Sequence, residues 1–333
     1  MFVTDRKLKC SLCDRDAVVR IPYAKLRLCK EHFSHYIERR VKEAIMKYRL
    51  ISKNQRVVIG VSGGKDSVSL LYILNKLSKE IGFEIVAVHI DLGIGDYSKK
   101  SREIVKNLCD SLGVPLVLLD LKELVGYSLP EIVRRVKRPA CSICGSIKRY
   151  LLNIIANELN ADAVALGHHL DDLITFITKN FVLQNLFEIS KLGPKSEGRD
   201  NLISRIRPLY LISEKETYLY ARINNLPFIE EICPFTDVKS FEKSLREAIN
   251  EIEEKHPGFK ISLAKSIARN LQLYKSLGVE KPLKRCRVCD APTSEDICSF
   301  CKLTEKITGR PLGGEVREKI REYIRSVRPA ATV

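Results

Sequence analysis

Short apolar runs alternate with amphipathic stretches through the middle of the chain. The runs over 56–61, 84–90, 115–121 and 161–166 are rich in valine, isoleucine and leucine. Between them, apolar residues recur at helical spacing over 67–81, 99–112 and 146–159. Nearly continuous apolar strands that alternate with helices are typical of a parallel sheet covered on both faces. The pattern therefore predicts an α/β fold.

The segments on either side of this region have different patterns. A helix is predicted over about 36–49, helical spacing returns over 239–277, and a short helix is predicted over about 315–326. The polar segment 191–201 predicts a surface loop, and the apolar segment 226–230 allows a late strand.

The net charge of the chain indicates a class of binding partner. The chain has 57 Lys and Arg against 41 Asp and Glu, a net charge of +16. Such a surplus favours RNA or DNA as a partner, with a merely solubilising basic surface as the alternative. No run of about 18 apolar residues occurs, and Asp5, Arg6, Lys7 and Lys9 stand where a signal peptide would be apolar. We expect a cytoplasmic protein that does not enter a membrane.

A glycine-rich loop follows the first predicted strand. It reads GVSGGKDS, with Gly60, Ser62, Gly63, Gly64, Lys65, Asp66 and Ser67 as candidate binding residues. A helix that begins here would present free N–H groups and its positive dipole end to an anion. The spacing does not match Walker A, which has four residues between its first glycine and its Gly-Lys. The loop also has more small and charged residues in a row than a plain turn requires.

Eight ligand-type residues form two sets at metal-binding spacing. They read C-x2-C-x15-C-x2-H (Cys10, Cys13, Cys29, His32) and C-x2-C-x8-C-x2-C (Cys286, Cys289, Cys298, Cys301). Each set supplies the four ligands of a closed tetrahedral site, so we expect two structural Zn²⁺ ions. The predicted organisation is a zinc finger over 1–35, a catalytic domain over 36–240, a helical segment over 241–284, a second finger over 285–305 and a basic tail over 306–333.

A third cysteine group is incomplete. Cys141 and Cys144 stand just before a predicted helix, Cys233 is followed by proline, and Cys109 lies within an apolar helix as a core residue. Three cysteines can hold a 4Fe–4S cluster with one iron left open. A C-x2-C pair at a helix N-terminus can equally be a thiol redox pair. A third zinc site is less favoured, and the spacing alone does not decide between the first two.

Several stretches resemble a known family. SGGKDS resembles the PP-loop of the N-type ATP pyrophosphatases, which cleave ATP between its α- and β-phosphates. Together with HIDLGIGDYS (89–98), CSICGSIKRY (141–150), GHHLDD (167–172), EEICP (230–234) and the two fingers, it resembles the tRNA 2-thiouridine synthetases of the TtuA type, relatives of TtcA. The resemblance covers nearly the whole chain and implies a Rossmann-like PP-loop domain flanked by two zinc fingers.

The resemblance also implies roles for individual residues. Cys141, Cys144 and Cys233 would bind a 4Fe–4S cluster, and Lys148 and Asp172 would line the catalytic pocket beside ATP. The loop residues would hold pyrophosphate and Mg²⁺, while Gly60, Ile90 and Gly167 would frame the adenine and ribose. His169 stands where the family usually has asparagine, which weakens a direct role for it. A structural alternative for Asp171 and Asp172 is a pair of helix N-terminal carboxylates.

The implied reaction is tRNA 2-thiolation. The C2 oxygen of a uridine attacks the α-phosphate of ATP, and sulfide carried on the open iron then replaces the adenylated oxygen. Position 54, a 5-methyluridine, is favoured, and a wobble uridine or a cytidine is the alternative target. The family also implies a thiocarboxylated ubiquitin-like sulfur carrier and a homodimer. Two other classes stay open: a PP-loop ligase or amidotransferase for small molecules, and a non-catalytic RNA-binding protein.

Overall fold

A six-stranded sheet forms the centre of the protein in the computed structural model, which describes residues 8–237, 239–279 and 282–327. The strand order is β5-β4-β3-β6-β8-β7, and every pair is parallel except β7 with β8. The strands are β3 (Arg56–Gly60), β4 (Glu84–Asp91), β5 (Leu116–Asp120), β6 (Ala163–Ala165), β7 (Lys195–Ser196) and β8 (Ser204–Ile206). The predicted α/β class with a parallel sheet is confirmed.

Alternating side chains of the central strand β3 separate two layers of helices. Val57 and Ile59 pack into one apolar cluster, and Val58 packs into another on the opposite face. The first cluster holds α1 (Lys30–Lys47), α2 (Lys65–Ile81), α3 (Gly95–Leu112) and α9 (Glu214–Ile223). The second holds α4 (Leu121–Val125), α5 (Leu129–Arg135) and α6 (Ala140–Glu158). Strands buried on both faces explain the uninterrupted apolar runs in the sequence.

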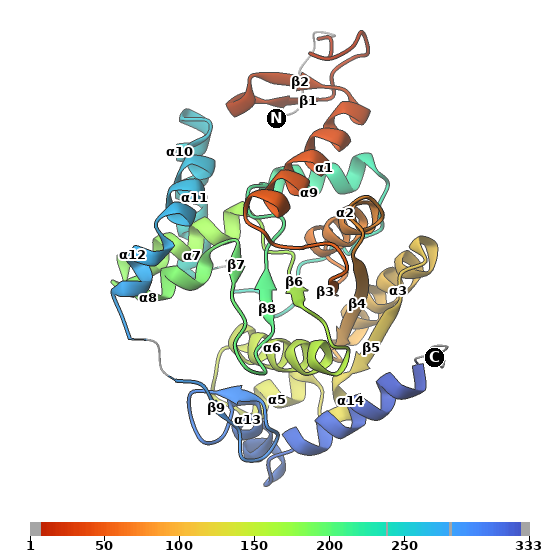
Figure 1. Ribbon diagram of the computed structural model, residues 1–333, viewed down its shortest axis with the longest axis vertical. Helices are drawn as coiled ribbons and strands as arrows, with labels where there is room; N and C mark the ends of the chain where they lie inside the picture. The colour runs from red at the N-terminus through yellow and green to blue at the C-terminus, as the bar shows by residue number, and fades with distance from the viewer. Residues whose placement is uncertain (1–7, 238, 280–281, 328–333) are drawn as a thin grey trace.

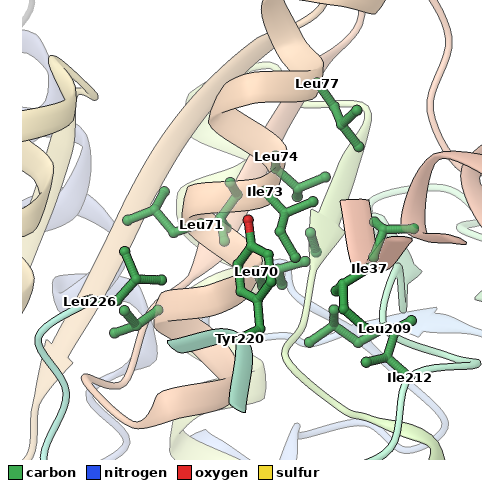
Figure 2. Packing of buried hydrophobic residues seen from close by; sticks show 14 of the residues in the cluster. Ile37, Leu70, Leu71, Ile73, Leu74, Leu77, Leu209, Ile212, Tyr220 and Leu226 are labelled. Atoms are coloured by element: carbon green, nitrogen blue, oxygen red, sulfur yellow. The ribbon is translucent and has the colours of Figure 1, made fainter. Parts of the chain in front are cut away.

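Helix α2 anchors the first layer. Its side chains Leu70, Ile73 and Leu74 lie in one apolar cluster with Tyr220 of α9 and Ile37 of α1, as Figure 2 shows. Tyr220 is fully buried, and its hydroxyl donates a hydrogen bond of 2.7 Å to a carboxylate oxygen of Glu38. Burial on this scale stabilises the protein by about 2 kcal/mol for each large apolar side chain. The helix that follows the glycine-rich loop is therefore held rigidly.

Two fingers lie at opposite ends of the molecule (Figure 1). The N-terminal finger comprises β1 (Val19–Ile21), the short 3₁₀ helix η1 (Pro22–Ala24), β2 (Leu26–Leu28) and the start of α1. The C-terminal finger comprises β9 (Lys284–Arg285), β10 (Pro292–Thr293) and α13 (Ser299–Thr308), and α14 (Gly313–Val327) follows it. Both fingers are built from an antiparallel hairpin and a helix.

A helical group covers one flank of the sheet domain (Figure 1). It contains α7 (Leu170–Val182), α8 (Leu186–Ile189), the 3₁₀ helix η2 (Ser190–Leu192), α10 (Phe241–Lys255), α11 (Phe259–Arg269) and α12 (Leu271–Ser276). Helices α10 and α11 both pack on α7. The helical pattern predicted over 239–277 is confirmed. None of the helices in the described ranges is long and apolar enough to cross a membrane.

Several sequence expectations were wrong in detail. Helix α6 begins at Ala140, not at 146: Pro139 directly precedes it, and Cys141 and Cys144 lie within its first turns rather than before it. No strand forms over 226–230; the N–H of Ile229 instead donates a hydrogen bond of 2.9 Å to the carbonyl of Gly63. The polar segment 191–201 contains β7. Asp5, Arg6, Lys7 and the last residues of the predicted basic tail, 328–333, lie outside the described residues.

Candidate functional site

The glycine-rich loop connects β3 to α2 at the carboxyl edge of the sheet. The N–H of Ser62 donates a hydrogen bond of 3.1 Å to the hydroxyl of Ser67, which itself donates to the carbonyl of Gly64 at 2.9 Å. Gly63 has a φ of +83°, and a Cβ there would lie 2.9 Å from the Cβ of Ser101. Glycine is therefore required at this position, and the loop backbone stays accessible to an anion at the start of α2.

A cavity of about 500 Å³ lies beside this loop. Its wall joins three sequence motifs that lie far apart in the chain: the loop, the start of α6 and the segment after β6. The predicted site residues in the wall are Gly60, Ser62, Gly64, Asp66, Ser67, Ile90, Cys141, Cys144, Lys148, Gly167 and Cys233. Gly63, Lys65 and Asp172 are not part of the wall. The volume fits a nucleotide-sized ligand.

The start of α6 brings two thiols and an amine to one face. Cys141, Cys144 and Lys148 are spaced i, i+3 and i+7, so they follow one stripe of the helix. Cys233 reaches the same cavity from the segment after α9, and the thiol of Cys141 lies 3.6 Å from the carbonyl oxygen of Phe235. Partial burial raises the pKa of the Cys141 thiol, and the neighbouring Cys144 and Cys233 raise it further.

These three thiols differ from the two predicted zinc sets. In each zinc set the four ligand atoms lie within 4.8 Å of one another, and no third set in the described ranges meets that condition. The thiols Cys286–Cys301 and Cys289–Cys298 are 3.8 and 3.7 Å apart. A zinc tetrahedron with bonds of about 2.3 Å has edges of about 3.8 Å, so the C-terminal set fits a single ion closely. Cys141, Cys144 and Cys233 have room for a larger group.

The N-terminal set fits zinc in the same way. His32 Nδ1 lies 3.4 Å from the sulfurs of both Cys10 and Cys29, and the sulfurs of Cys13 and Cys29 are 3.9 Å apart. Cys29 caps helix α1 and His32 lies in its first turn, just as Cys298 and Cys301 do in α13. In both fingers the start of a helix therefore supplies the second ligand pair. The first pair of the C-terminal finger lies between β9 and β10, whereas Cys10 and Cys13 lie before β1, between the bridged residues Lys9 and Asp16.

Charged side chains surround Lys65 and Asp172 beside the cavity. The ammonium of Lys65 lies 3.1 Å from Asp66 and 3.0 Å from Glu214. Burial would lower the pKa of Lys65, but these carboxylates raise it overall, so the group stays charged. Burial would likewise raise the pKa of Asp172, but His169 and Arg246 lower it overall.

Asp171 has a structural environment. Its carboxylate pairs with the ammonium of Lys260, and both side chains are 6% exposed. It also accepts a hydrogen bond of 2.7 Å from the N–H of Glu214. These contacts join α7 to α11 and to the start of α9. The structural alternative considered for Asp171 therefore agrees with its surroundings.

Two histidines in the cavity wall were not among the predicted site residues. His89 Nδ1 donates a hydrogen bond of 2.8 Å to the carbonyl of Val61, next to Gly60, and burial lowers the pKa of His89. Its Nε2 is buried and has no hydrogen-bond partner in the described part of the chain, and the same holds for Nδ1 of His168. The sequence held one clue to His89: it is a polar residue near the end of an apolar strand, the place where parallel sheets bind ligands.

The fold and the site define a PP-loop nucleotide-binding protein: a parallel sheet presents a lysine-bearing glycine loop at a helix start. Two family models match the chain. One is described as "PP-loop domain" and matches residues 33–236, and the other is "2-thiouridine synthetase TtuA, N-terminal LIM domain" and matches residues 9–34. The PP-loop implies that the chain binds ATP.

Comparison with individual proteins narrows the class. The tRNA-5-methyluridine(54) 2-sulfurtransferase of Pyrococcus horikoshii is 39% identical, over 89% of this chain and 93% of its own length. The enzyme of the same name from Thermus thermophilus is 33% identical, over 90% and 92%. The U34-tRNA thiolase NcsA of Methanococcus maripaludis, solved with its 4Fe–4S cluster, matches with a TM-score of 0.75 and 27% identity over 90% of this chain and 96% of its own. The chain belongs to the PP-loop family of TtuA-type tRNA 2-thiouridine synthetases.

Proposed function

We propose that this chain is an ATP-dependent tRNA 2-sulfurtransferase that replaces the C2 oxygen of 5-methyluridine at position 54. One observation carries the proposal: a single cavity joins the glycine-rich loop to three cysteines and to Lys148. A nucleotide-activating loop and a sulfur-handling group must share one substrate if the base is to be adenylated and then thiolated. A ligase for small molecules would not need the three cysteines.

The loop supplies the first half of the reaction. The N–H groups at the start of α2, the hydroxyls of Ser62 and Ser67 and the Lys65 ammonium stabilise the departing pyrophosphate. Asp66 offers a carboxylate for Mg²⁺ beside these phosphates. Lys148, in the cavity wall, stabilises negative charge on the α-phosphate or on the base. The C2 oxygen of the uridine forms a bond to the α-phosphorus while the bond to the β-phosphate oxygen breaks.

The three cysteines supply the second half. Cys141, Cys144 and Cys233 hold a 4Fe–4S cluster, as the spread of their thiols around the cavity allows. When bound, the cluster would supply an open iron site that carries sulfide for C2. The C2–O bond of the adenylated base would break, and the oxygen would leave as part of AMP. Lys148 lies one turn beyond Cys144 and orients the adenylated base toward the cluster. Thiol chemistry at Cys141 and Cys144 is the competing mechanism.

Cationic groups around the site fit an RNA substrate. Arg149 and Arg205 line the cavity, and neither forms a salt bridge within the described ranges. Arg205 is half-buried, and its pKa is lowered by burial and by Arg149. Two repelling guanidinium groups favour a phosphate between them. Arg287 and Lys302 of the C-terminal finger are exposed as well, and each lies beside an acidic partner, Asp296 and Glu295.

The closed four-ligand sets hold two structural Zn²⁺ ions. By family resemblance, the enzyme takes sulfur from a thiocarboxylated ubiquitin-like carrier, acts in the cytoplasm and forms a homodimer. Size-exclusion chromatography with light scattering tests the last point, since a monomer at micromolar concentration would contradict it.

The proposal is tested by anaerobic reaction of the purified protein with ATP, sulfide and tRNA transcripts whose uridine 54 has been methylated to 5-methyluridine. Mass spectrometry of the digested tRNA should find a 2-thiolated nucleoside at position 54, and pyrophosphate release should require tRNA. A transcript with position 54 changed to cytidine should lose the product, whereas a change at the wobble position should not. Pyrophosphate release without tRNA would instead favour a ligase or amidotransferase, and no ATP binding would favour a non-catalytic RNA-binding protein.

A further inference from the structure

A chain of charged contacts runs from α10 to the glycine-rich loop. Arg246 Nη2 donates to Asp172 on α7, and its Nη1 lies 3.0 Å from Glu214 at the start of α9. The other oxygen of Glu214 lies 3.0 Å from Lys65, which lies 3.1 Å from Asp66. Arg246 is outside the residues matched by the PP-loop model. The sequence around it, FEKSLREAIN, shows no motif and would pass for a solvated helix face.

These contacts are partly shielded from water. The side chains of Lys65, Asp172 and Arg246 are 23%, 22% and 27% exposed, and that of Glu214 is 39% exposed. Isolated ion pairs on the surface contribute little to stability. A guanidinium that bridges two carboxylates on different elements is more strongly constrained, because its planar fork fixes both partners at once.

Arg246 balances the charge around the nucleotide lysine. Without it, Asp172 and Glu214 would lack their guanidinium partner, and Lys65 would be drawn further toward Glu214. The ammonium of lysine has three donors on a flexible stem, so its position depends on the charges around it. With Arg246 in place, Lys65 can keep one contact to Glu214 and direct another donor to a phosphate.

We propose that Arg246 is a positioning residue for the ATP step: it fixes Asp172 and Glu214, and Glu214 in turn fixes Lys65 for the phosphates of ATP. The inference rests on the proposed function of the loop and extends the site to a helix beyond the PP-loop domain. Arg246 itself does not line the cavity, so it acts through Glu214 and Asp172.

The competing explanation is that Arg246 only docks α10. Two other ion pairs also join α10 to its neighbours: Lys179 of α7 with Glu242, and Lys215 of α9 with Glu254 at 3.1 Å. The Lys215 pair joins the same two helices as the contact between Arg246 and Glu214, and its side chains are 61% and 69% exposed. Lys215→Gln is therefore a matched control that removes an α9–α10 ion pair without touching the charge chain.

The test compares Arg246→Gln, Arg246→Lys, Glu214→Gln and Lys215→Gln in the full holoenzyme. We expect Arg246→Gln to raise KM for ATP, and the Kd of a non-hydrolysable ATP analogue, about tenfold or more, with kcat lowered as well. Arg246→Lys should show a smaller loss, because lysine keeps the positive charge but cannot bridge both carboxylates as a guanidinium does. Lys215→Gln should stay within about twofold of wild type, as should tRNA affinity in all four variants.

A double variant tests whether the contacts act in series. If Arg246 acts through Glu214, the combined Glu214→Gln and Arg246→Gln variant should lose far less than the product of the two single effects. Purely multiplicative effects would overturn the proposal. So would an Arg246→Gln variant that melts earlier but keeps the wild-type KM, kcat and analogue affinity.

The test can still be interpreted if Arg246→Gln does not fold. Glu214→Gln and Arg246→Lys then carry the test, and wild-type analogue affinity in both would overturn the proposal. Failure of the proposed function is distinguishable: wild type would bind the analogue but release no tRNA-dependent pyrophosphate. The effect of Arg246 on analogue affinity would remain measurable in that case.

Discussion

The C-terminal finger and the three-cysteine cavity use the same C-x2-C pair in opposite ways. In the finger, a second pair closes the site, and all four sulfurs are buried at tetrahedral spacing. In the cavity, the pair Cys141 and Cys144 meets one further cysteine, and Cys141 is exposed. Burial and the number of partner ligands, not the C-x2-C spacing, therefore distinguish the proposed structural zinc site from the proposed cluster site.

The two regions are also physically connected. Tyr150 of α6 stacks on Phe300 of the finger with ring centroids 3.9 Å apart, and its hydroxyl donates to the carbonyl of Gly313 at 2.9 Å. Cys141, Cys144 and Lys148 lie on the same helix as Tyr150. The C-terminal finger therefore supports α6, the helix that carries Cys141, Cys144 and Lys148.

The largest effect is expected from Cys144→Ser. Thiolation should fall by about a thousandfold or more, because an essential ligand is lost, while ATP binding and thermal stability change little. Cys109→Ala is the matched control, since this thiol is buried in the first apolar cluster and burial raises its pKa to about 11. Activity and melting temperature of both variants check the comparison; retained thiolation in Cys144→Ser would break it.

A large effect on stability is expected from Cys286→Ser. Isolated structural zinc sites contribute about 10–16 kcal/mol to folding, and a finger packed on a domain should contribute at least about 3 kcal/mol. We expect a lower melting temperature and the loss of one Zn²⁺, measured by calorimetry and metal analysis. Activity should recover in part at low temperature, where α6 is still held. An unchanged melting temperature would show that the closed site is not structural.

A smaller effect is expected from Glu158→Gln. Glu158 joins α6 to α14 through Arg317 and Arg321 at 3.1 and 3.0 Å, and its side chain is 13% exposed. Its loss should destabilise the protein by about 1–2 kcal/mol at neutral pH.

The pH dependence of that effect has a definite sign. Burial would raise the pKa of Glu158, but the two arginines lower it overall. The stabilisation is therefore complete above the unfolded pKa of about 4.3 and is lost as pH falls through the lower folded pKa. Melting temperatures of wild type and variant should converge at low pH, and a constant difference would contradict the assignment.

The sequence predicted those sites whose ligands lie close together along the chain. It was less informative where residues from distant segments meet only in the folded protein. Both four-ligand sets could be predicted because each lies within one short segment of the chain, 10–32 and 286–301. Strands β7 and β8 were missed because they are two and three residues long and carry polar residues such as Ser204 and Arg205. The apolar segment 226–230 suggested a strand, yet Ile229 serves to hold the glycine-rich loop.

The charge chain could not be read from the sequence at all. Glu214 and Arg246 lie on amphipathic helices where charges normally face solvent. The packing of α9 against α2 brings Glu214 to Lys65, and the packing of α10 against α7 brings Arg246 to Asp172. Asp172 was expected in the pocket by family resemblance, whereas the structure directs its carboxylate to Arg246. Long-range packing decides such contacts, so local patterns do not encode them.

The most direct test of the open and closed sites is metal analysis with visible absorption of anaerobically purified wild type, Cys233→Ser and Cys109→Ala. We predict two zinc ions and about four irons per chain in wild type and in Cys109→Ala, with a broad absorption near 400 nm. Cys233→Ser should keep both zinc ions and lose the iron and the absorption. A colourless wild type with zinc alone, or a Cys233→Ser variant that keeps its iron, would contradict the three-cysteine cluster.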